Sequence, residues 1–276
     1  MPAPALYEPT LTVSTMATLR IGTVDLPARV EREHYFQHLS YLELSALFQS
    51  PLKPAAIAKW QTMAPAGALG LVAPWVLTQR KPPGAGPSWA HDPTVGDFRN
   101  SAPGRAALAA FRDAVTALTA GQVVFRSPPL FAPSSANRDQ LRRFFGEVAT
   151  EEAVGAPRVW LPDGLWEPRI AVAFATELGV LCAIDPLVHD PSSPAEVYED
   201  LEAPALYFRI AGLGRSGQIR TEKLEDLAGL VEHYQGVALT IAFASAQRWR
   251  DARNFKKLLG DEVAVAEESA GPPGRD

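Results

Sequence analysis

Residues 205–243 decide the fold: ALYFRI (205–210) is followed by TEKLEDLAGLVEHY (221–234) and then by VALTIAF (237–243). The first and last runs are short, apolar and rich in residues that favour strands, whereas the middle segment has apolar residues at helical spacing. A strand, a helix and a second strand in this order form a βαβ unit, in which the strands are parallel. The segment therefore predicts an α/β fold with a parallel sheet.

The same alternation continues toward both ends of the chain. Helical patterns, such as the one that Pro54 opens, separate six further predicted strands at 19–24, 41–47, 68–75, 122–128, 157–162 and 179–185. Eight parallel strands can close into a barrel with no free sheet edge, and a length of 276 residues suits one such barrel. We predict a single (β/α)8 TIM-type barrel, with an open doubly wound sheet as the alternative.

The barrel is expected to span residues 19–260. Residues 1–18 are interpreted as an N-terminal arm and residues 261–276 as a flexible acidic tail, because the tail turns from acidic residues to glycine and proline. The segment 78–105 is too rich in proline and glycine for regular structure, and loops of this length are usually lids or linkers. It is expected to be a lid over the barrel mouth.

Bulk properties limit the range of functions. The formal net charge is −5, which repels a phosphate backbone and argues against a nucleic acid partner. The single cysteine, Cys182, lies in an apolar run and is expected to be buried and unreactive. No signal peptide and no run of about 20 apolar residues is present, so we expect no membrane association and a cytoplasmic location.

In a (β/α)8 barrel, functional side chains lie at the carboxyl ends of the strands. Read in this way, the candidates are Asp25, Glu43, Ser45, Trp75, Arg126, Asp163, Asp185, Arg209 and Ser245.

Three of these candidates are predicted to bind a ligand: Glu43, Asp185 and Arg209. The alternation of the second strand turns Glu43 inward, where an unpaired charge is costly, so it either lines a ligand pocket or pairs with Arg209. Asp185 and Arg209 both end apolar strands and either face one cavity or form a mutual salt bridge.

Weaker signals lie outside these three residues. A candidate anion-binding loop, formed by Gly212, Gly214, Arg215 and Gly217, has the spacing GxGxxG, but glycine-rich turns are also common between strands and helices. The basic residues around Trp249 in the last helix either form a nucleic acid face or are a solvated outer surface. The histidines lack metal-site spacing, so the sequence predicts no metal site and identifies no cofactor.

Several strings in order resemble the YecE-like family, the domain of unknown function 72: LRIGTV, YLELSALFQSP, KWQTMAP, VVFRSPPLF, CAIDP, LYFRIAG and ARNFKKLL. The resemblance covers about residues 19–260. It implies a parallel barrel related in shape to the endonuclease IV and xylose isomerase group, and the biochemical activity of the family is not established. Glu43, Phe48, Asp185 and Arg209 match the family pattern.

Other positions depart from that pattern. A glutamate-aromatic-arginine-histidine stretch is replaced by 160–163 (WLPD), a histidine-glycine pair by Ala211-Gly212, and a Phe-Asn-Asn string by 243–245 (FAS). A site that acts as a unit loses most of its activity when one member is removed. We therefore expect a divergent YecE-like barrel with an incomplete active site that binds a small polar or anionic ligand or a protein partner. The alternative is a metal-assisted hydrolase or isomerase acting on a phosphoester or sugar-like substrate.

Overall fold

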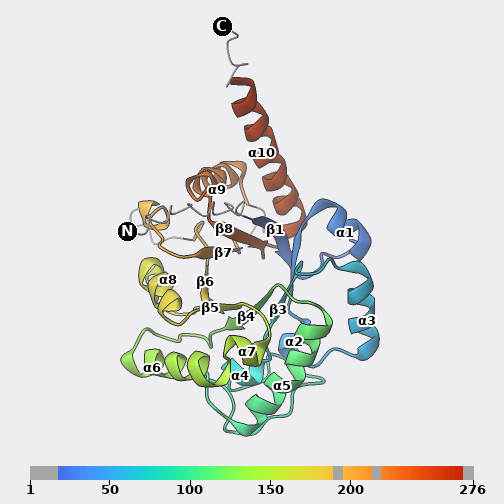
Figure 1. Cartoon of the computed structure of the whole chain (residues 1–276), viewed down its shortest axis with the longest axis vertical. Helices are drawn as coiled ribbons and strands as arrows, with labels where there is room; N and C mark the ends of the chain where they lie inside the picture. Colours follow the sequence, from blue (N-terminus) through green and yellow to red (C-terminus); the bar gives the residue numbers. More distant parts are fainter. Residues whose placement is uncertain (1–17, 189–194, 213–218, 270–276) are drawn as a thin grey trace, which may run out of the picture.

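The computed structural model describes residues 18–188, 195–212 and 219–269, and eight parallel strands form a closed barrel in sequence order (Figure 1). The barrel closes where β1 pairs with β8, with Leu19 opposite Leu239. The predicted (β/α)8 barrel is confirmed, and closure excludes an open sheet. The strands are β1 Leu19–Val24, β2 Tyr41–Leu44, β3 Leu69–Val72, β4 Gln122–Arg126, β5 Arg158–Leu161, β6 Leu181–Ile184, β7 Ala205–Ile210 and β8 Ala238–Phe243.

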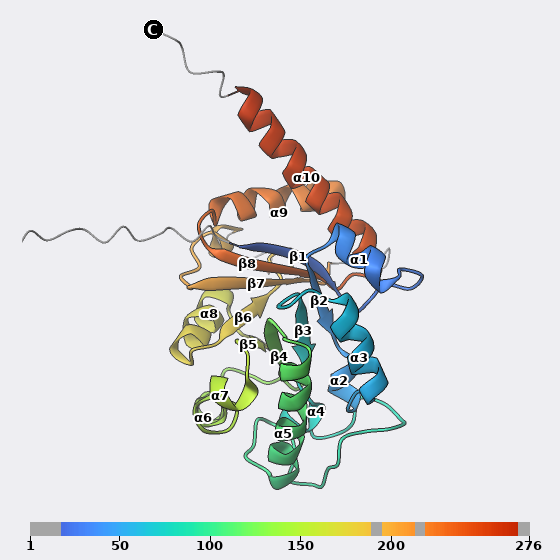
Figure 2. The same cartoon turned by 45° about the vertical axis from the view of Figure 1, so that its right-hand side comes forward.

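The helices surround the barrel on its outside, as a turned view shows (Figure 2). None of those in the described part of the chain is long and apolar enough to cross a membrane. They are α1 Arg32–His38, α2 Ala46–Gln49, α3 Pro54–Met63, α4 Trp75–Thr78, α5 Ala102–Ala117, α6 Ser135–Arg143, α7 Glu151–Val154, α8 Pro168–Glu177, α9 Thr221–His233 and α10 Arg248–Ser269, with a π-helical turn η1 at Phe144–Val148 and a 3-10 turn η2 at Ala195–Tyr198.

Local sequence explains where several of these helices begin. Pro54 occupies the first turn of α3, where its missing N–H breaks no hydrogen bond. The Ser134 hydroxyl accepts a hydrogen bond from the backbone N–H of Asn137 at 3.2 Å and so caps α6. The last helix, α10, continues to Ser269 and so extends into the segment 261–276 that the sequence indicates as a flexible acidic tail.

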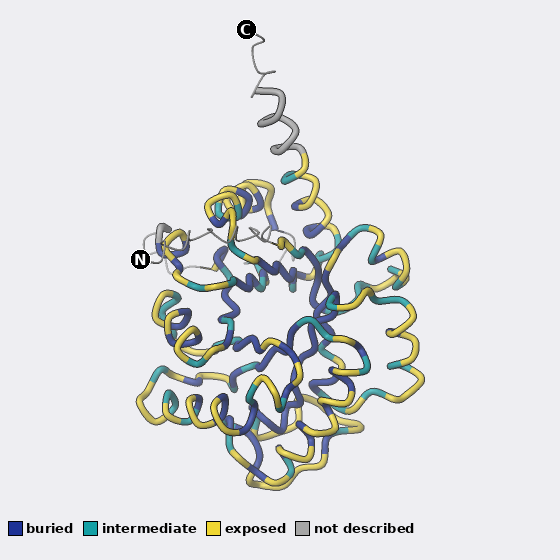
Figure 3. The backbone as a smooth tube through the Cα atoms, in the orientation of Figure 1, coloured by how far each residue is buried: buried dark blue, intermediate teal, exposed yellow. Residues whose placement is uncertain are grey.

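Buried residues follow the ring of strands, and the helices alternate between buried inner and exposed outer faces (Figure 3). Inside the barrel, Tyr41 of β2 and Tyr207 of β7 lie with their hydroxyl oxygens 3.2 Å apart. Gly70 of β3 leaves room for this pair, because a Cβ at that position would lie 1.8 Å from the Tyr41 hydroxyl oxygen. Cys182 of β6 is buried, as expected, and burial raises the pKa of its thiol.

The long segment after β3 is bonded to the barrel rim. The Trp89 indole donates to the carbonyl of Leu47 at 2.8 Å, and the buried ring of Phe98 contacts Phe131, Phe144 and Phe145. These contacts lie beside α2 and η1 instead of across the barrel axis. The segment therefore packs as part of the wall around β3 and β4, and its expected action as a lid stays a prediction.

Candidate ligand site at the barrel mouth

Glu43 of β2 and Arg209 of β7 meet inside the carboxyl end of the barrel. The Glu43 side chain is fully buried, and the Nε of Arg209 lies 3.2 Å from one of its oxygens and 3.3 Å from the other. The Tyr207 hydroxyl donates to Glu43 at 2.6 Å. Of the two arrangements that the sequence left open for Glu43, the structure contains the buried ion pair, and this pair uses only the Nε of Arg209.

A second guanidinium lies near this ion pair. Arg126 at the end of β4 is partly buried, and its guanidinium stacks over the Phe48 ring at 4.9 Å. Burial and the positive charge of Arg209 lower the pKa of Arg126, whereas Glu43 raises the pKa of Arg209 despite burial. Within the described residues Arg126 forms no ion pair, so a partly buried cation lacks a direct counter-charge at the mouth.

Asp185 follows β6, but its carboxylate is bonded to backbone. One oxygen accepts the N–H of Leu187 at 3.0 Å and the other accepts the N–H of Ala211 at 2.6 Å. Burial raises the pKa of Asp185, and these backbone bonds together with Arg209 partly offset the effect. Arg209 pairs with Glu43, and within the described residues no ion pair joins it to Asp185, so of the two arrangements left open for Asp185 and Arg209 the mutual salt bridge does not form.

Two other strand-end carboxylates hold loops in place. Asp25, in a left-handed conformation with φ 56°, accepts the backbone N–H of Ser45 at 2.8 Å and its hydroxyl at 2.5 Å. Asp163 accepts the backbone N–H of Leu130 at 2.9 Å and so joins the loops after β4 and β5. Both groups stabilise the rim and are neighbours of the mouth arginines.

The remaining candidates are hydrogen-bonded to groups other than Glu43, Arg126 and Arg209. Trp75 is buried and donates from its indole to Ser88, and the Ser245 hydroxyl donates to Asp251 of α10 at 2.5 Å. In the candidate anion-binding loop, only Gly212 is described, and Gly214, Arg215 and Gly217 lie outside the described residues. Over the described ranges, no group of three histidine, cysteine, aspartate or glutamate side chains is arranged to hold a metal ion.

Sequence reasoning missed one member of the ion-pair cluster, and the signal for it was present. Tyr207 precedes Arg209 by two residues in β7, so strand alternation places both side chains on the same face of the sheet. A tyrosine two positions before an inward arginine is thus expected to point into the barrel. Arg126 was a strand-end candidate but was not among the three predicted ligand-binding residues.

Comparison with known proteins identifies the fold and not the function. No protein-family model matches the sequence, and no curated protein matches it significantly. Among solved structures, a DUF72 family protein from Enterococcus faecalis V583 is 14% identical with a TM-score of 0.63, covering 88% of this chain and 96% of that chain. A DUF72 family protein from Thermotoga maritima MSB8 is 15% identical with a TM-score of 0.60, covering 88% and 99%.

An enzyme with the same architecture is also similar. A D-allulose 3-epimerase from Methylomonas sp., solved in complex with D-allulose, is 14% identical with a TM-score of 0.55, covering 92% of this chain and 99% of that chain. At such identities the likeness concerns the path of the chain and carries no side-chain chemistry. This chain therefore has the barrel fold of DUF72 family proteins, the family that its sequence motifs resemble.

Proposed function

We propose that the chain is a divergent YecE-like barrel that binds a small anionic ligand at its mouth through Arg126 and Arg209. The observation that carries this proposal is the partly buried guanidinium of Arg126, which has no ion-pair partner in the described part of the chain and lies close enough to Arg209 for mutual repulsion. A carboxylate or phosphate between the two guanidiniums would remove this repulsion. Arginine forks match both anions in a bidentate geometry.

Glu43 and Asp185 have positioning roles in this proposal. Glu43 accepts hydrogen bonds from the Nε of Arg209. The two terminal guanidinium nitrogens of Arg209 have no hydrogen-bond acceptor among the described residues. Asp185 fixes the backbone at Ala211, directly after β7. Neither carboxylate would contact the ligand itself, because their oxygens are already hydrogen-bonded.

The family pattern supports binding in place of catalysis. The glutamate, arginine and histidine of the family motifs are replaced at 160–163 and 211, whereas the residues of the ion pair are retained. No specific observation favours the metal-assisted hydrolase or isomerase, and a thermal-shift screen with divalent metal ions distinguishes it from anion binding.

The proposal is tested by a thermal-shift screen of small carboxylates, inorganic phosphate and sugar phosphates, each with and without divalent metal ions. A ligand that binds only the folded state raises the melting temperature by mass action. We expect a small anion to stabilise the wild type and not Arg126→Met, whereas Arg112→Met on the outer helix α5 responds like the wild type. Equal shifts in both variants would contradict the mouth site, and stabilisation that needs a metal with a phosphoester would favour the hydrolase.

A further inference from the structure

A cleft of about 790 Å³ lies beside the mouth, between the segment after α4, the loop after β4 and the helix α6. Its polar lining includes Arg80, Lys81, Asp97, Arg99 and Arg143. Both of the connecting segments follow the carboxyl ends of strands, so the cleft opens on the face where barrels of this kind bind ligands.

The charges that line this cleft are unbalanced. Arg80 and Arg99 both form ion pairs with Asp97, the second at 2.9 Å. Within the described ranges, neither Lys81 nor Arg143 forms an ion pair. Four cations and one carboxylate leave three positive charges in excess, on a chain whose formal net charge is −5.

A strained turn holds the carboxylate of Asp97 in place. Gly96, Asp97 and Phe98 all have left-handed backbone, with φ of 85°, 51° and 59°. Their three N–H groups bond to the carbonyls of 76, 78 and 77, which are the last turn of α4. Non-glycine residues rarely adopt this conformation, and those that do are concentrated at functional sites. The turn is therefore a fixed support for the two arginines.

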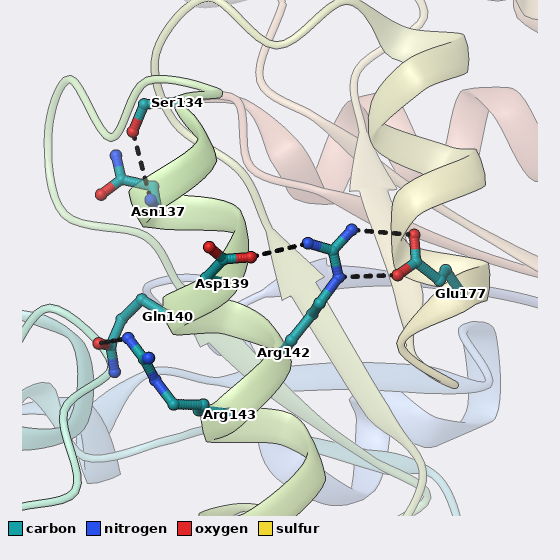
Figure 4. A network of polar contacts seen from close by, with 7 residues as sticks. All are labelled: Ser134, Asn137, Asp139, Gln140, Arg142, Arg143 and Glu177. Carbon is teal, nitrogen blue, oxygen red and sulfur yellow. Dashed lines mark hydrogen bonds and ion pairs between the residues drawn. The ribbon is translucent and has the colours of Figure 1, made fainter.

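Two adjacent arginines of α6 point to different sides of the helix (Figure 4). Arg142 is saturated by carboxylates, since it pairs with Asp139 at 2.9 Å and with Glu177 of α8 at 2.8 Å. Arg143 instead lines the cleft, where its only described side-chain partner is the amide oxygen of Gln140 at 3.2 Å. Arg143 is thus available to an anion and Arg142 is not.

One side of the cleft is apolar. Pro129, Leu130 and Phe131 line it, and the Leu130 residue is 85% exposed with a left-handed φ of 59°. An exposed leucine in a conformation that leucine rarely adopts is held there by the bond from its N–H to Asp163. The cleft therefore combines an excess of positive charge with an exposed apolar edge.

We infer that this cleft binds an organic diphosphate, with its phosphates at Lys81 and Arg143 beside the Arg80–Asp97–Arg99 group and its organic part against Leu130. Three excess charges favour a ligand with at least two negative charges over a monocarboxylate. Arginine and lysine are the usual phosphate-binding side chains. The inference does not depend on the proposed mouth ligand, because it uses different residues.

The test is isothermal titration calorimetry at low ionic strength, with EDTA present and inorganic pyrophosphate and ADP as the two probes. We expect pyrophosphate to bind the wild type and to bind the double variant Lys81→Met/Arg143→Met at least tenfold more weakly. Arg142→Met is the matched control, one residue away on the same helix, and should bind like the wild type. ADP should bind more tightly than pyrophosphate. The substitution Leu130→Asn should remove that preference, and it should not disturb the turn because asparagine tolerates the left-handed backbone conformation.

Each other outcome overturns part of the inference. Absence of pyrophosphate binding to the wild type, or an equal loss in Arg142→Met, would show that no specific site exists in the cleft. Loss of binding in Arg126→Met with retention in the double variant would place the anion at the mouth, which supports the proposed function and contradicts this inference. An unchanged ADP preference in Leu130→Asn would exclude the apolar contact.

Discussion

The buried carboxylate of Glu43 depends on two side chains of β7, and this dependence gives a test at the level of single residues. Tyr207→Phe removes the 2.6 Å hydrogen bond and leaves one Glu43 oxygen with only the Nε of Arg209. Weakening the hydrogen bonding of a buried charge costs about 1 to 3 kcal/mol. We expect the free energy of unfolding to fall by this amount in urea denaturation.

Tyr41→Phe is the matched control for this substitution. Its hydroxyl is bonded to that of Tyr207 at 3.2 Å and forms no described bond to Glu43. A neutral hydrogen bond contributes about 0.5 to 1.5 kcal/mol, so the loss should be smaller. Equal losses in the two variants would contradict a special dependence of Glu43 on Tyr207.

Asp251 of α10 gives a prediction of pH dependence. Its side chain is buried, and burial raises the pKa of its carboxyl group. In the unfolded chain the pKa of an aspartate is about 3.9, and in the folded protein the pKa of Asp251 is higher. The folded state therefore has its full stability below the pKa of the unfolded chain, and it loses stability as the pH rises through the pKa of the folded protein. We expect Asp251→Asn to gain stability relative to the wild type from pH 4 upward, by about 1.4 kcal/mol per unit of pKa difference.

The measurement is urea unfolding between pH 4 and pH 8. The hydrogen bond from the Ser245 hydroxyl lowers the pKa of Asp251. Ser245→Ala removes this bond and should raise the pKa of Asp251 further. Its stability should fall further with rising pH than that of the wild type. Parallel curves for Asp251→Asn and the wild type would contradict the prediction.

At the level of elements, the turn at 96–98 within the long segment 78–105 depends on one glycine. A Cβ at Gly96 would lie 2.3 Å from the carbonyl oxygen of Gln79, and the φ of 85° is unfavourable for alanine. Gly96→Ala should therefore displace the turn that bonds to the end of α4 and lower the free energy of unfolding by more than about 1 kcal/mol. Gly86→Ala, in the same loop and also at positive φ, has no neighbour within 4 Å and should cost less in thermal unfolding.

Element types could be predicted from the sequence more reliably than element ends. Short continuous apolar runs identified all eight strands, because a parallel barrel buries each strand on both faces. The predicted second strand 41–47 ends at Leu44, since the Asp25 carboxylate binds Ser45 and α2 begins at Ala46. This hydrogen bond joins residues 20 positions apart. The local sequence pattern around Ser45 therefore could not predict where the strand ends.

One of the two candidate sites could be predicted from the sequence and the other could not. Glu43 and Arg209 could be predicted because strand position alone turns them into the barrel. The cleft could not, because Arg80 and Arg99 come from an irregular segment and Arg143 from a distant helix. Their convergence depends on the left-handed turn at 96–98, for which the sequence contains only Gly96 as a signal.

At the scale of the whole molecule, the barrel depends on the close approach of the neighbouring strands β1 and β2. A Cβ at Gly22 would lie 1.7 Å from the carbonyl oxygen of Tyr41, the residue with which it is paired. Since the collision is with backbone, Gly22→Ala should lower the free energy of unfolding by more than about 4 kcal/mol or prevent folding. Circular dichroism and urea unfolding measure the effect.

The control is a glycine in open space. Gly229 lies in α9 with nothing within 4 Å of an added Cβ, so alanine should stabilise the protein by up to about 1 kcal/mol. A similar loss in both variants would show that the close approach of β1 and β2 has no special role.

The ion pair across the barrel also bears on how the protein is made. Glu43 and Arg209 are 166 residues apart in the chain. At about 5 to 20 residues per second, the ribosome needs roughly 10 to 30 s to add that length after Glu43 has been incorporated. During this time the carboxylate has no arginine partner from β7 and stays hydrated, so the end of β2 keeps a negative charge while the barrel is open. The inner face of the sheet at β2 is therefore completed only when β7 and β8 arrive and the ring closes.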